Sequence, residues 1–247
     1  ALNDGSGPHP PVQLQYSYFE NPYSDVDTHN ITMSIEERDV SISTSVFYNC
    51  GRGVLSDTGS DLTFTDNYVI YTGSMHDALH AFRGRMTVEN SVFLSCSDSL
   101  EVSLETDLPT NIANCFIFDD NDDAIDCNFS SPILEGNVIS GSADKGISIG
   151  GGNPGPSLVN NLIYDCNWGV AIKNRSQPVI DHNTIVENNI GINSYEDAPG
   201  AGGGLGSLQN SIVWGNGQHI WLQQDSELDI SYSLVDTTPP PTGAGNI

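Results

Sequence analysis

The sequence predicts an all-β protein, a single-stranded right-handed parallel β-helix (solenoid) of about ten coils. The first observation is a hydrophobic motif that returns about every 23 residues: apolar, x, Asn or a small residue, x, apolar, apolar. "VENSVF" from Val88 and "IDHNTI" from Ile180 are two copies. This period suits one coil of a parallel β-helix, in which only stacking on the next coil buries the apolar face. Right-handed crossovers are the rule between parallel strands.

The first apolar residue of each motif marks one strand per coil. These residues are Leu14, Ile42, Phe64, Val88, Ile112, Leu134, Val159, Ile180, Leu208 and Ile230. Within one turn of successive coils the sequence repeats an asparagine, at Asn67, Asn90, Asn114, Asn137, Asn161, Asn183 and Asn210. We expect these side chains to form a structural ladder that satisfies the backbone groups of the turn.

The second observation is a run that follows the motif in most repeats, at 78–82, 100–104, 124–129, 146–150, 169–173, 191–195 and 219–223. Apolar and polar residues alternate in it, which predicts a strand with one buried side. One predicted inward column is Leu79, Leu100, Ile125, Ile147, Val170, Ile192 and Ile220. The second is Ala81, Val102, Cys127, Ile149, Ile172, Ser194 and Leu222.

Three segments follow from the repeat. Residues 1–11 are rich in Gly and Pro and are expected to form an N-terminal strap or linker, whereas residues 12–236 form the parallel β-helix. Residues 237–247, "TTPPPTGAGNI", are interpreted as a Pro/Gly-rich linker or a truncated continuation. Because neither end shows a capping helix, we expect flanking domains of a longer chain.

Charge excludes some partners. Seven Lys and Arg face 32 Asp and Glu, for a formal net charge of −25. A nucleic-acid surface needs clustered cations, so nucleic acid is excluded as a partner. The sequence has no apolar run long enough to span a bilayer, which argues against direct membrane insertion. The five cysteines are expected to be mostly buried thiols.

Chemistry is expected on the outward side of the second strand. One outward column is Leu55, His80, Glu101, Asp126, Ser148, Ala171, Asn193 and Trp221. The next is Phe82, Ser103, Asn128, Gly150, Lys173, Tyr195 and Gln223. The turn before the strand adds Asp77, Asp98, Asp122, Asp123, Asp144 and Lys145. Acidic residues therefore gather over neighbouring coils, which lie about 4.8 Å apart.

These residues leave several functions open. The candidate catalytic set is Asp98, Glu101, Asp122, Asp123, Asp126, Lys145 and Lys173. In a glycoside hydrolase, Asp123 or Glu101 would be the acid and Asp98, Asp122 or Asp126 the base. In a lyase, Lys145 or Lys173 would be the base. A solvated acidic surface is the remaining alternative.

Metal and substrate residues come from the same columns. Calcium prefers oxygen ligands, and its candidate ligands are Asp98, Glu101, Asp122, Asp123 and Asp126. The candidate substrate-binding residues are His80, Asn128, Tyr195 and Trp221. Trp221 is the tryptophan best placed to stack on a sugar ring, because it is predicted to point outward.

With its repeat and alternating strands, the chain resembles the right-handed parallel β-helix superfamily, often called pectate-lyase-like. "DDAIDC" at 122–127, "GVAIKNRS" at 169–176 and "NSIVWGN" at 210–216 resemble β-helix modules of secreted bacterial proteins, some of which accompany CotH-like kinase or lamin-tail domains. The resemblance implies a secreted or cell-surface protein.

A partial resemblance to polygalacturonases rests on three neighbouring coils. Asp98, the Asp122–Asp123 pair and "DKGISIG" at 144–150 match the order of that family's motifs, and Lys173 matches its Arg-Ile-Lys lysine. Lys145 stands where the family has a histidine, and Ala171 stands where it has the arginine.

Three functional hypotheses follow. The first is a secreted β-helix domain that binds a polysaccharide through the acidic outward surface, with calcium as a possible cofactor. The second is a polysaccharide hydrolase or lyase that uses the same surface, and the third is a structural spacer or adhesin segment of a larger surface protein. The charge of −25 favours a neutral glycan over a polyanion unless calcium bridges the two.

Overall fold

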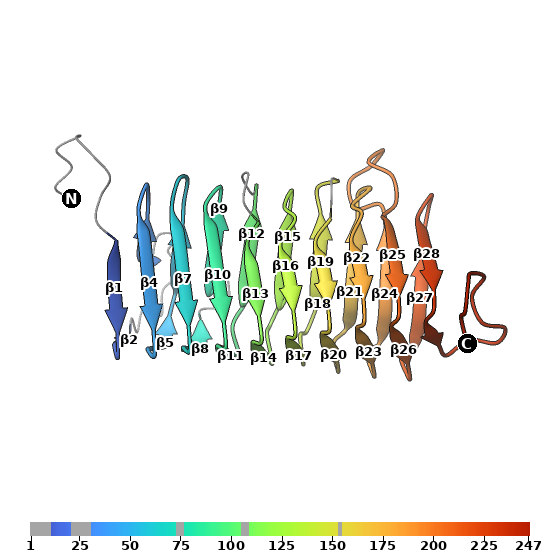
Figure 1. The fold of residues 1–247 in the computed structure, drawn as a ribbon, viewed down its shortest axis with the longest axis horizontal. Coiled ribbons are helices and arrows are strands. Elements are labelled where there is room, and N and C mark those ends of the chain that lie inside the picture. Colours follow the sequence, from blue (N-terminus) through green and yellow to red (C-terminus); the bar gives the residue numbers. More distant parts are fainter. Residues whose placement is uncertain (1–10, 21–30, 73–76, 105–108, 153–154) are drawn as a thin grey trace.

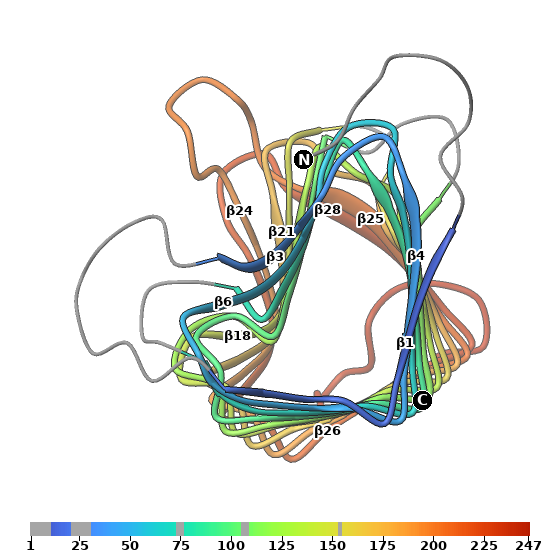
Figure 2. The ribbon, with the colours of Figure 1, turned by 90° about the vertical axis from the view of Figure 1, so that its left-hand side faces the viewer.

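Three parallel sheets wind into one solenoid. The computed structural model describes residues 11–20, 31–72, 77–104, 109–152 and 155–247, and residues 1–10 of the predicted strap at 1–11 lie outside this part. Within the described ranges every regular element is a strand, and the sheets contain ten, ten and nine strands. The strands lie side by side along the long axis (Figure 1), and end-on the sheets form three walls around the core (Figure 2). The predicted all-β solenoid of about ten coils is confirmed.

Sheet A contains the first strand of every coil. Its strands are β1 (Val12–Gln15), β4 (Asp39–Ser43), β7 (Asp61–Thr65), β10 (Arg85–Glu89), β13 (Asn111–Ala113), β16 (Ile133–Glu135), β19 (Ser157–Val159), β22 (Val179–Asp181), β25 (Leu205–Gln209) and β28 (Glu227–Ser231).

Sheet B follows after one tight turn. Its strands are β2 (Tyr18–Glu20), β5 (Val46–Cys50), β8 (Tyr68–Thr72), β11 (Val92–Leu94), β14 (Phe116–Phe118), β17 (Val138–Ser140), β20 (Leu162–Tyr164), β23 (Thr184–Val186), β26 (Ile212–Trp214) and β29 (Leu234–Val235).

Sheet C closes each coil and carries the predicted functional columns. Its strands are β3 (Ile31–Ile35), β6 (Arg52–Ser56), β9 (Leu79–Phe82), β12 (Leu100–Ser103), β15 (Ile125–Asn128), β18 (Lys145–Gly150), β21 (Trp168–Lys173), β24 (Ile190–Tyr195) and β27 (Gln218–Leu222). In the part of the chain described here, no helix is long and apolar enough to cross a membrane.

The apolar columns fill the core. Both predicted inward columns of sheet C are aligned by pairing and are buried from Leu79 to Ile192 and from Ala81 to Ser194. Leu222 was also predicted to be buried, but it is 44% exposed because its strand, β27, is the last of sheet C. In sheet A the prediction slips by one residue in one coil. Leu158, not Val159, pairs with Leu134 and Ile180. Leu158 is fully buried, whereas Val159 is half-buried on the outward side, because two adjacent apolar residues leave the inward position ambiguous.

A polar ladder runs through the turn between sheets A and B. In this ladder, a buried asparagine side chain accepts a hydrogen bond from the backbone N–H of the equivalent residue one coil earlier. Asn161 Oδ1 accepts from Asn137 N at 3.0 Å, and Asn183 Oδ1 accepts from Asn161 N at 2.8 Å. Asn161 Nδ2 also donates to the Leu134 carbonyl at 2.8 Å. The side chain thus satisfies backbone groups that the turn removes from the sheets.

Only four of the seven predicted ladder asparagines occupy this position: Asn67, Asn137, Asn161 and Asn183. The prediction was wrong for Asn90, Asn114 and Asn210, which precede the ladder residues Ser91, Cys115 and Ser211. These three have φ of 51°, 54° and 49°, in the left-handed region that Asn tolerates better than most residues.

The ladder continues into the last residues of the chain. Asn246 Oδ1 accepts a hydrogen bond from Ser233 N at 3.1 Å, and Asn246 Nδ2 donates to the Ile230 carbonyl at 3.0 Å. This is the pattern that Asn67 makes with Ser45 N and the Ile42 carbonyl. Residues 244–247 therefore pair with the last coil, where Ile247 N donates to the Ser233 carbonyl.

A second ladder lies in the turn between sheets B and C and contains an acidic residue. Asn188 Oδ1 accepts from Cys166 N at 3.0 Å, and in the equivalent position Asp120 Oδ1 accepts from Cys96 N at 3.0 Å. Asn188 Nδ2 donates to the carbonyls of Ile163 and Val186, whereas Asp120 Oδ2 is buried and has no hydrogen-bond partner within the described part of the chain. Burial raises the pKa of Asp120 to about 7.

Replacing Asp120 with Asn should stabilise the protein at high pH. The folded state raises the pKa of Asp120 from 3.8 to about 7, so its stability contribution is lost as pH rises through this range. At about 1.36 kcal/mol per pKa unit, we expect Asp120→Asn to gain roughly 2–4 kcal/mol at pH 8 relative to its effect at pH 4. Urea unfolding at the two pH values measures this difference.

Asp119→Asn is the matched control. Asp119 is the exposed neighbour of Asp120 and has φ of 60°, which Asn accepts as readily as Asp. The Asp119→Asn substitution removes the same formal charge but no buried carboxyl group. Its effect on the free energy of unfolding should therefore be small and the same at both pH values. An equal gain in both variants would show that net charge, not the ladder carboxyl, sets the pH dependence.

Candidate functional site

Strand pairing aligns the predicted outward columns of sheet C, although Ser148, Ala171 and Asn193 in the first column are fully buried. Pairing aligns His80 with Glu101, Glu101 with Asp126 and Asp126 with Ser148 in one column. In the adjacent column, Asn128 is paired with Gly150, and Lys173 with Tyr195. Trp221 lies farther along the first column, paired with Asn193.

A third column lies at the start of these strands. Asp77, Asp98, Asp123 and Lys145 each precede by two residues the aligned apolar residues Leu79, Leu100, Ile125 and Ile147. They therefore occupy equivalent positions on four consecutive coils. Arg52 precedes Asp77 in the same column, since Val54 pairs with Leu79. We call these three columns together the sheet C surface.

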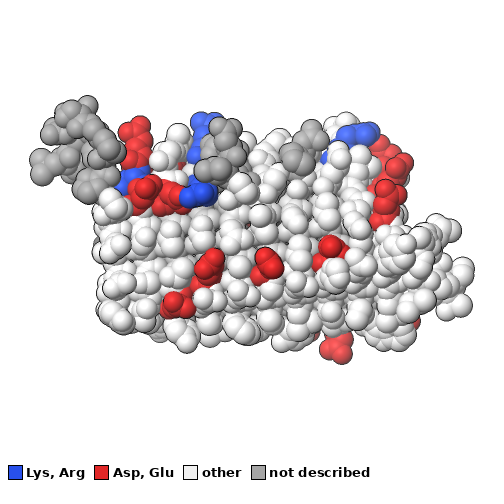
Figure 3. Space-filling view, viewed as in Figure 1, with Lys and Arg blue, Asp and Glu red and all other residues white. Residues whose placement is uncertain are grey.

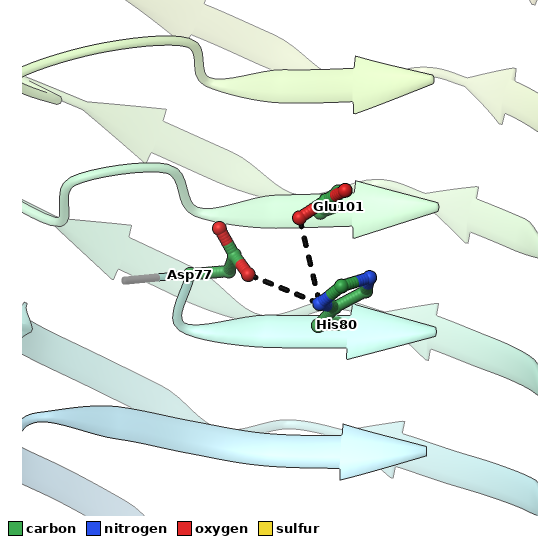
Figure 4. A group of neighbouring side chains, drawn as sticks. All are labelled: Asp77, His80 and Glu101. Atoms are coloured by element: carbon green, nitrogen blue, oxygen red, sulfur yellow. Dashed lines mark ion pairs between the residues drawn. The ribbon is translucent and has the colours of Figure 1, made fainter. Parts of the chain in front are cut away.

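One group on this surface consists of Asp77, His80 and Glu101 (Figure 4). His80 Nδ1 lies 3.2 Å from Asp77 Oδ2 and 3.4 Å from Glu101 Oε2. Arg52 Nη2 approaches the same Asp77 oxygen at 3.3 Å. On the far side, Ser103 Oγ donates a short hydrogen bond to Glu101 Oε1. The strand β9 and the turn before it supply two members, and β12 supplies the third.

The pKa values of the two carboxyls in this group move in opposite directions. Burial would raise the pKa of Asp77, but His80 and Arg52 outweigh burial and hold it below the usual value. Burial, and then the nearby charge of Asp77, raise the pKa of Glu101. Asp77 is therefore the more fully ionised carboxylate of the pair at mildly acidic pH.

A second group consists of Asp122, Asp123, Asp144 and Lys145. The Lys145 ammonium lies 3.1 Å from Asp123 Oδ1 and makes a shorter contact with Asp144 Oδ2. Burial alone would lower the pKa of Lys145, but Asp123 and Asp144 outweigh it and raise the pKa above the usual value. Lys145 Nζ also lies 5.7 Å from the centre of the Trp168 ring. Lys145 therefore remains a cation at any pH near neutral.

Asp98 lies between the two groups and has the most strongly raised pKa among the acids of this surface for which a value is resolved. Burial, and then the charges of Asp77, Asp123 and Asp122, raise it to about 8. Burial also raises the pKa of Asp123, to about 6, although Lys145 opposes the shift. The Asp98 carboxyl accepts a hydrogen bond from Asp123 N at 3.2 Å. At neutral pH, Asp98 is thus mostly protonated while Asp123 is mostly ionised.

The remaining predicted residues spread along the surface. Asn128 Nδ2 donates to Asp126 Oδ2 at 2.7 Å, so these two lie together. Tyr195 is packed edge-on against Trp168, with ring centres 5.6 Å apart, and burial raises its pKa to about 12. Lys173 is half-buried beside Tyr195, and Trp221 is exposed several coils away from the acids.

The structure divides the predicted calcium ligands between the groups. Glu101 joins Asp77 and His80, whereas Asp122 and Asp123 join Asp144. Among the residues that the structure describes, Asp98 and Asp126 fall in neither close set of metal-binding atoms. Asp77 and Asp144 were expected in the turn before the strand but were not included among the candidate metal ligands. Arg52 and Trp168 were missed as members of the site. Each lies two residues before an aligned inward residue, Val54 and Val170, so the strand register could have placed both.

The surface of sheet A does not carry the candidate site residues. The side of the molecule formed by sheet A carries scattered acids among uncharged side chains, with Lys and Arg beside acids near its upper edge (Figure 3). The strands of this sheet carry Glu89, Glu135 and Asp181, and Arg85 of β10 pairs with Asp61 of β7. A shallow groove of about 300 Å³ borders this sheet, near Pro178 and Leu205. It contains none of the predicted site residues, so we place the candidate site on sheet C by its chemistry.

Removing Lys145 should destabilise the fold, because the buried carboxylate of Asp123 would lose its counter-charge. We expect Lys145→Met to cost about 3 kcal/mol at pH 8, the scale for breaking a buried pair. The loss should shrink at pH 5, where Asp123 takes up a proton. Urea unfolding at both pH values tests this, with Lys173→Met as the matched lysine control. Equal losses in the two variants would contradict the assigned role.

Comparisons with known proteins agree with this fold. The family described as "Right handed beta helix region" matches residues 74–235. The Dettilon tailspike protein has a TM-score of 0.53 and 11% identity, covering 96% of this chain and 58% of that one. The catalytic unit of the GH87 alpha-1,3-glucanase from Streptomyces thermodiastaticus has a TM-score of 0.52 and 14% identity, covering 85% of this chain and 49% of that one.

No curated protein matches the sequence. The chain spans about half the length of the two solved structures that it resembles. At these identities, the likeness extends to the fold alone.

Proposed function

The chain belongs to the right-handed β-helix family, and we propose that it binds a neutral polysaccharide along the sheet C surface. The observation that carries this proposal is the alignment of polar, ionic and aromatic side chains over consecutive coils, from Asp77 and His80 to Trp221. Such a row offers hydrogen-bond acceptors and donors along an extended ligand, and aromatic rings at Trp168 and Trp221 for its apolar sugar faces.

A neutral glycan suits the charge better than a polyanion. The net charge is −25, and two of the seven basic residues, Arg52 and Lys145, are already paired with acids on this surface. A polyanion would meet carboxylates with few cations left to receive it. The similar Streptomyces protein is an alpha-1,3-glucanase, which supports a glucan as the first ligand to test.

A second candidate function is glycoside hydrolysis, and Asp98 favours it. A hydrolase needs one protonated carboxyl and one ionised carboxylate flanking the bond. Asp98, with a pKa of about 8, suits the acid, and Asp123, at about 6, suits the base or nucleophile. This exchanges the roles expected from the sequence, because neighbouring acids add to the effect of burial at Asp98, whereas Lys145 opposes the effect of burial at Asp123. Adjacent strands about 4.8 Å apart approach the short carboxyl separation of retaining enzymes.

A lyase that uses Lys145 as its base is a poorer fit. A base must lose its proton near working pH, and the two carboxylates beside Lys145 raise its pKa instead. Lys173, the other lysine, lies beside Tyr195 at the far edge of the acidic groups. We therefore propose hydrolysis rather than elimination as the chemistry to test.

We propose one calcium site, formed by Asp122, Asp123 and Asp144. Asp122, Asp123 and Asp144 offer oxygen atoms within 4.8 Å of one another, which suits a hard cation. Lys145 already supplies positive charge to two of these carboxylates, so calcium would compete with it. We expect calcium to bind weakly there and to bridge an anionic ligand rather than to hold the fold together.

We also propose that the protein is secreted or attached to the cell surface, as part of a longer chain with flanking domains. Polysaccharides of this kind are met outside the cell, and the acidic surface tolerates salt that screens its self-repulsion. A solenoid also suits the role of a spacer between domains. The spacer alternative predicts no glycan affinity, which the binding experiment below decides.

Removing the exposed indole of Trp221 should weaken glycan binding. We expect Trp221→Ala to lower the affinity for a soluble alpha-1,3-linked or other neutral glucan by about tenfold, or about 1.4 kcal/mol. Trp214→Ala is the control, because Trp214 is similarly exposed on sheet B. Affinity electrophoresis with and without calcium measures both. The absence of binding to any neutral glycan, or equal losses in both variants, would contradict the proposed surface.

Hydrolysis, tested by release of reducing ends, should show a bell-shaped pH profile between about 6 and 8. Activity falls below this window as Asp123 is protonated and falls above it as Asp98 loses its proton. Asp98→Asn should abolish release and leave glycan affinity intact, whereas Asp119→Asn should change neither. Binding without any release of reducing ends would exclude hydrolysis and leave the binding function standing.

A further inference from the structure

We propose that Asp77, His80 and Glu101 form a binding site for a divalent transition-metal ion of the zinc class. This inference does not depend on the proposed glycan function. One ligand atom from each residue, His80 Nδ1, Asp77 Oδ2 and Glu101 Oε2, faces the same point between β9 and β12 (Figure 4). Each of the three residues offers one ligand atom, and these ligand atoms lie within 4.8 Å of one another.

One separation of the imidazole nitrogen falls within the range expected for two ligands of one ion, and the other lies just below it. The imidazole nitrogen is 3.2 Å and 3.4 Å from the two carboxylate oxygens. Zinc bonds of about 2.0–2.2 Å in a tetrahedron place neighbouring ligand atoms roughly 3.3–3.6 Å apart. An N–H···O hydrogen bond spans about 2.7–3.2 Å and is nearly linear, so it is the angle rather than the distance that separates the shorter contact from a hydrogen bond. Neither contact of His80 Nδ1 meets hydrogen-bond geometry.

Burial makes the missing hydrogen bonds significant. The side chains of Asp77 and His80 are 10% and 11% exposed. Among the residues that the structure describes, Asp77 Oδ2 and both ring nitrogens of His80 are buried without a hydrogen bond, and Arg52 Nη2 lies 3.3 Å from that oxygen as an ion pair. Buried polar atoms are nearly always satisfied, and an ion is one of the ordinary explanations when they are not. The unsatisfied oxygen of Asp77 points toward His80, into the group itself (Figure 4).

The kinds of donor select the metal. Calcium and magnesium prefer shells made only of oxygen, whereas imidazole together with carboxylates suits zinc and its neighbours. Three protein ligands leave one tetrahedral position for water or a ligand oxygen, as in open zinc sites. The side chain of Glu101 is 20% exposed, which leaves a route from solvent to that position.

The surroundings orient the ligands as an outer shell would. Ser103 Oγ donates to Glu101 Oε1, which leaves Oε2 directed at His80. Arg52 Nη2, 3.3 Å from Asp77 Oδ2, fixes that carboxylate from the other side. Such partners commonly hold metal ligands in place. The charge of Arg52 also offsets one carboxylate, so we expect moderate rather than extreme affinity.

The second group on this surface provides an internal comparison. Asp122, Asp123 and Asp144 also bring their oxygen atoms together, but the Lys145 ammonium is bound to two of them. They contain no nitrogen ligand. A zinc-class ion should therefore select the group of Asp77, His80 and Glu101, and variants of the other group serve as controls.

Zinc titration of the full chain tests the proposal. After EDTA treatment and desalting, calorimetry should show one zinc ion bound per chain, and zinc but not calcium at equal concentration should raise the thermal midpoint. His80→Gln and Asp77→Asn should each weaken zinc binding by more than roughly 100-fold, because loss of even an outer-shell partner costs about 10–100-fold. His182→Gln removes an exposed His paired with Asp181 and Asp144→Asn alters the second group, so both should stay within about twofold of wild type.

Circular dichroism shows whether each variant is folded. If His80→Gln or Asp77→Asn does not fold, Glu101→Gln removes the third ligand and tests the same site. The visible spectrum of the cobalt-substituted wild type adds an independent readout, because nitrogen and oxygen ligands give tetrahedral bands without thiolate charge-transfer absorption. No saturable zinc binding, unchanged affinity in a folded His80→Gln protein, or a thiolate band from the buried cysteines would each overturn the proposal. Loss of glycan binding in the Trp221→Ala test would leave this result unaffected.

Discussion

Parallel pairing in strict register between coils is the constraint on which the other features of this protein depend. Each strand hydrogen-bonds to the equivalent strand one coil away, so a residue type at one position is stacked on the same position of the next coil. Inward stacking builds the core, for example where Phe19 and Phe47 pair in sheet B and their rings stack with centres 4.5 Å apart. Turns break the backbone pairing, and buried Asn and Ser side chains restore it there.

The same register explains what the sequence could reveal. Strands of sheet C alternate cleanly, so their inward and outward columns were predictable residue by residue. Leu158 and Val159 are both apolar, and only the three-dimensional register shows which one is buried. Asn90 and Asn67 look alike in the repeat, yet one satisfies a left-handed backbone and the other a buried ladder. Two neighbouring positions with the same residue preference cannot be separated by composition.

The candidate site was predictable only as a surface. The alternating pattern predicted that His80, Glu101 and Asp126 lie on the same side of the sheet. Which of the charged residues pair with one another depends on the paths of the long side chains between coils and turns, and the pattern does not give these paths. Arg52 reaches Asp77, and Lys145 reaches back to its own neighbour Asp144 and across to Asp123. These contacts decide which carboxyls are ionised. Asp98 has charged acids beside it and no cation among the main influences on its pKa, so it retains its proton near neutral pH.

The stacked register also gives the sheet C surface a fixed unit of length. Two groups in one column are separated by a whole number of strand spacings, each about 4.8 Å. Gain or loss of one complete coil would move every group beyond it by one such step and leave each local contact within a coil unchanged. The spacing between two side-chain groups on this surface is therefore set by the number of coils between them. A longer or shorter ligand can be matched by adding or removing coils between the two groups.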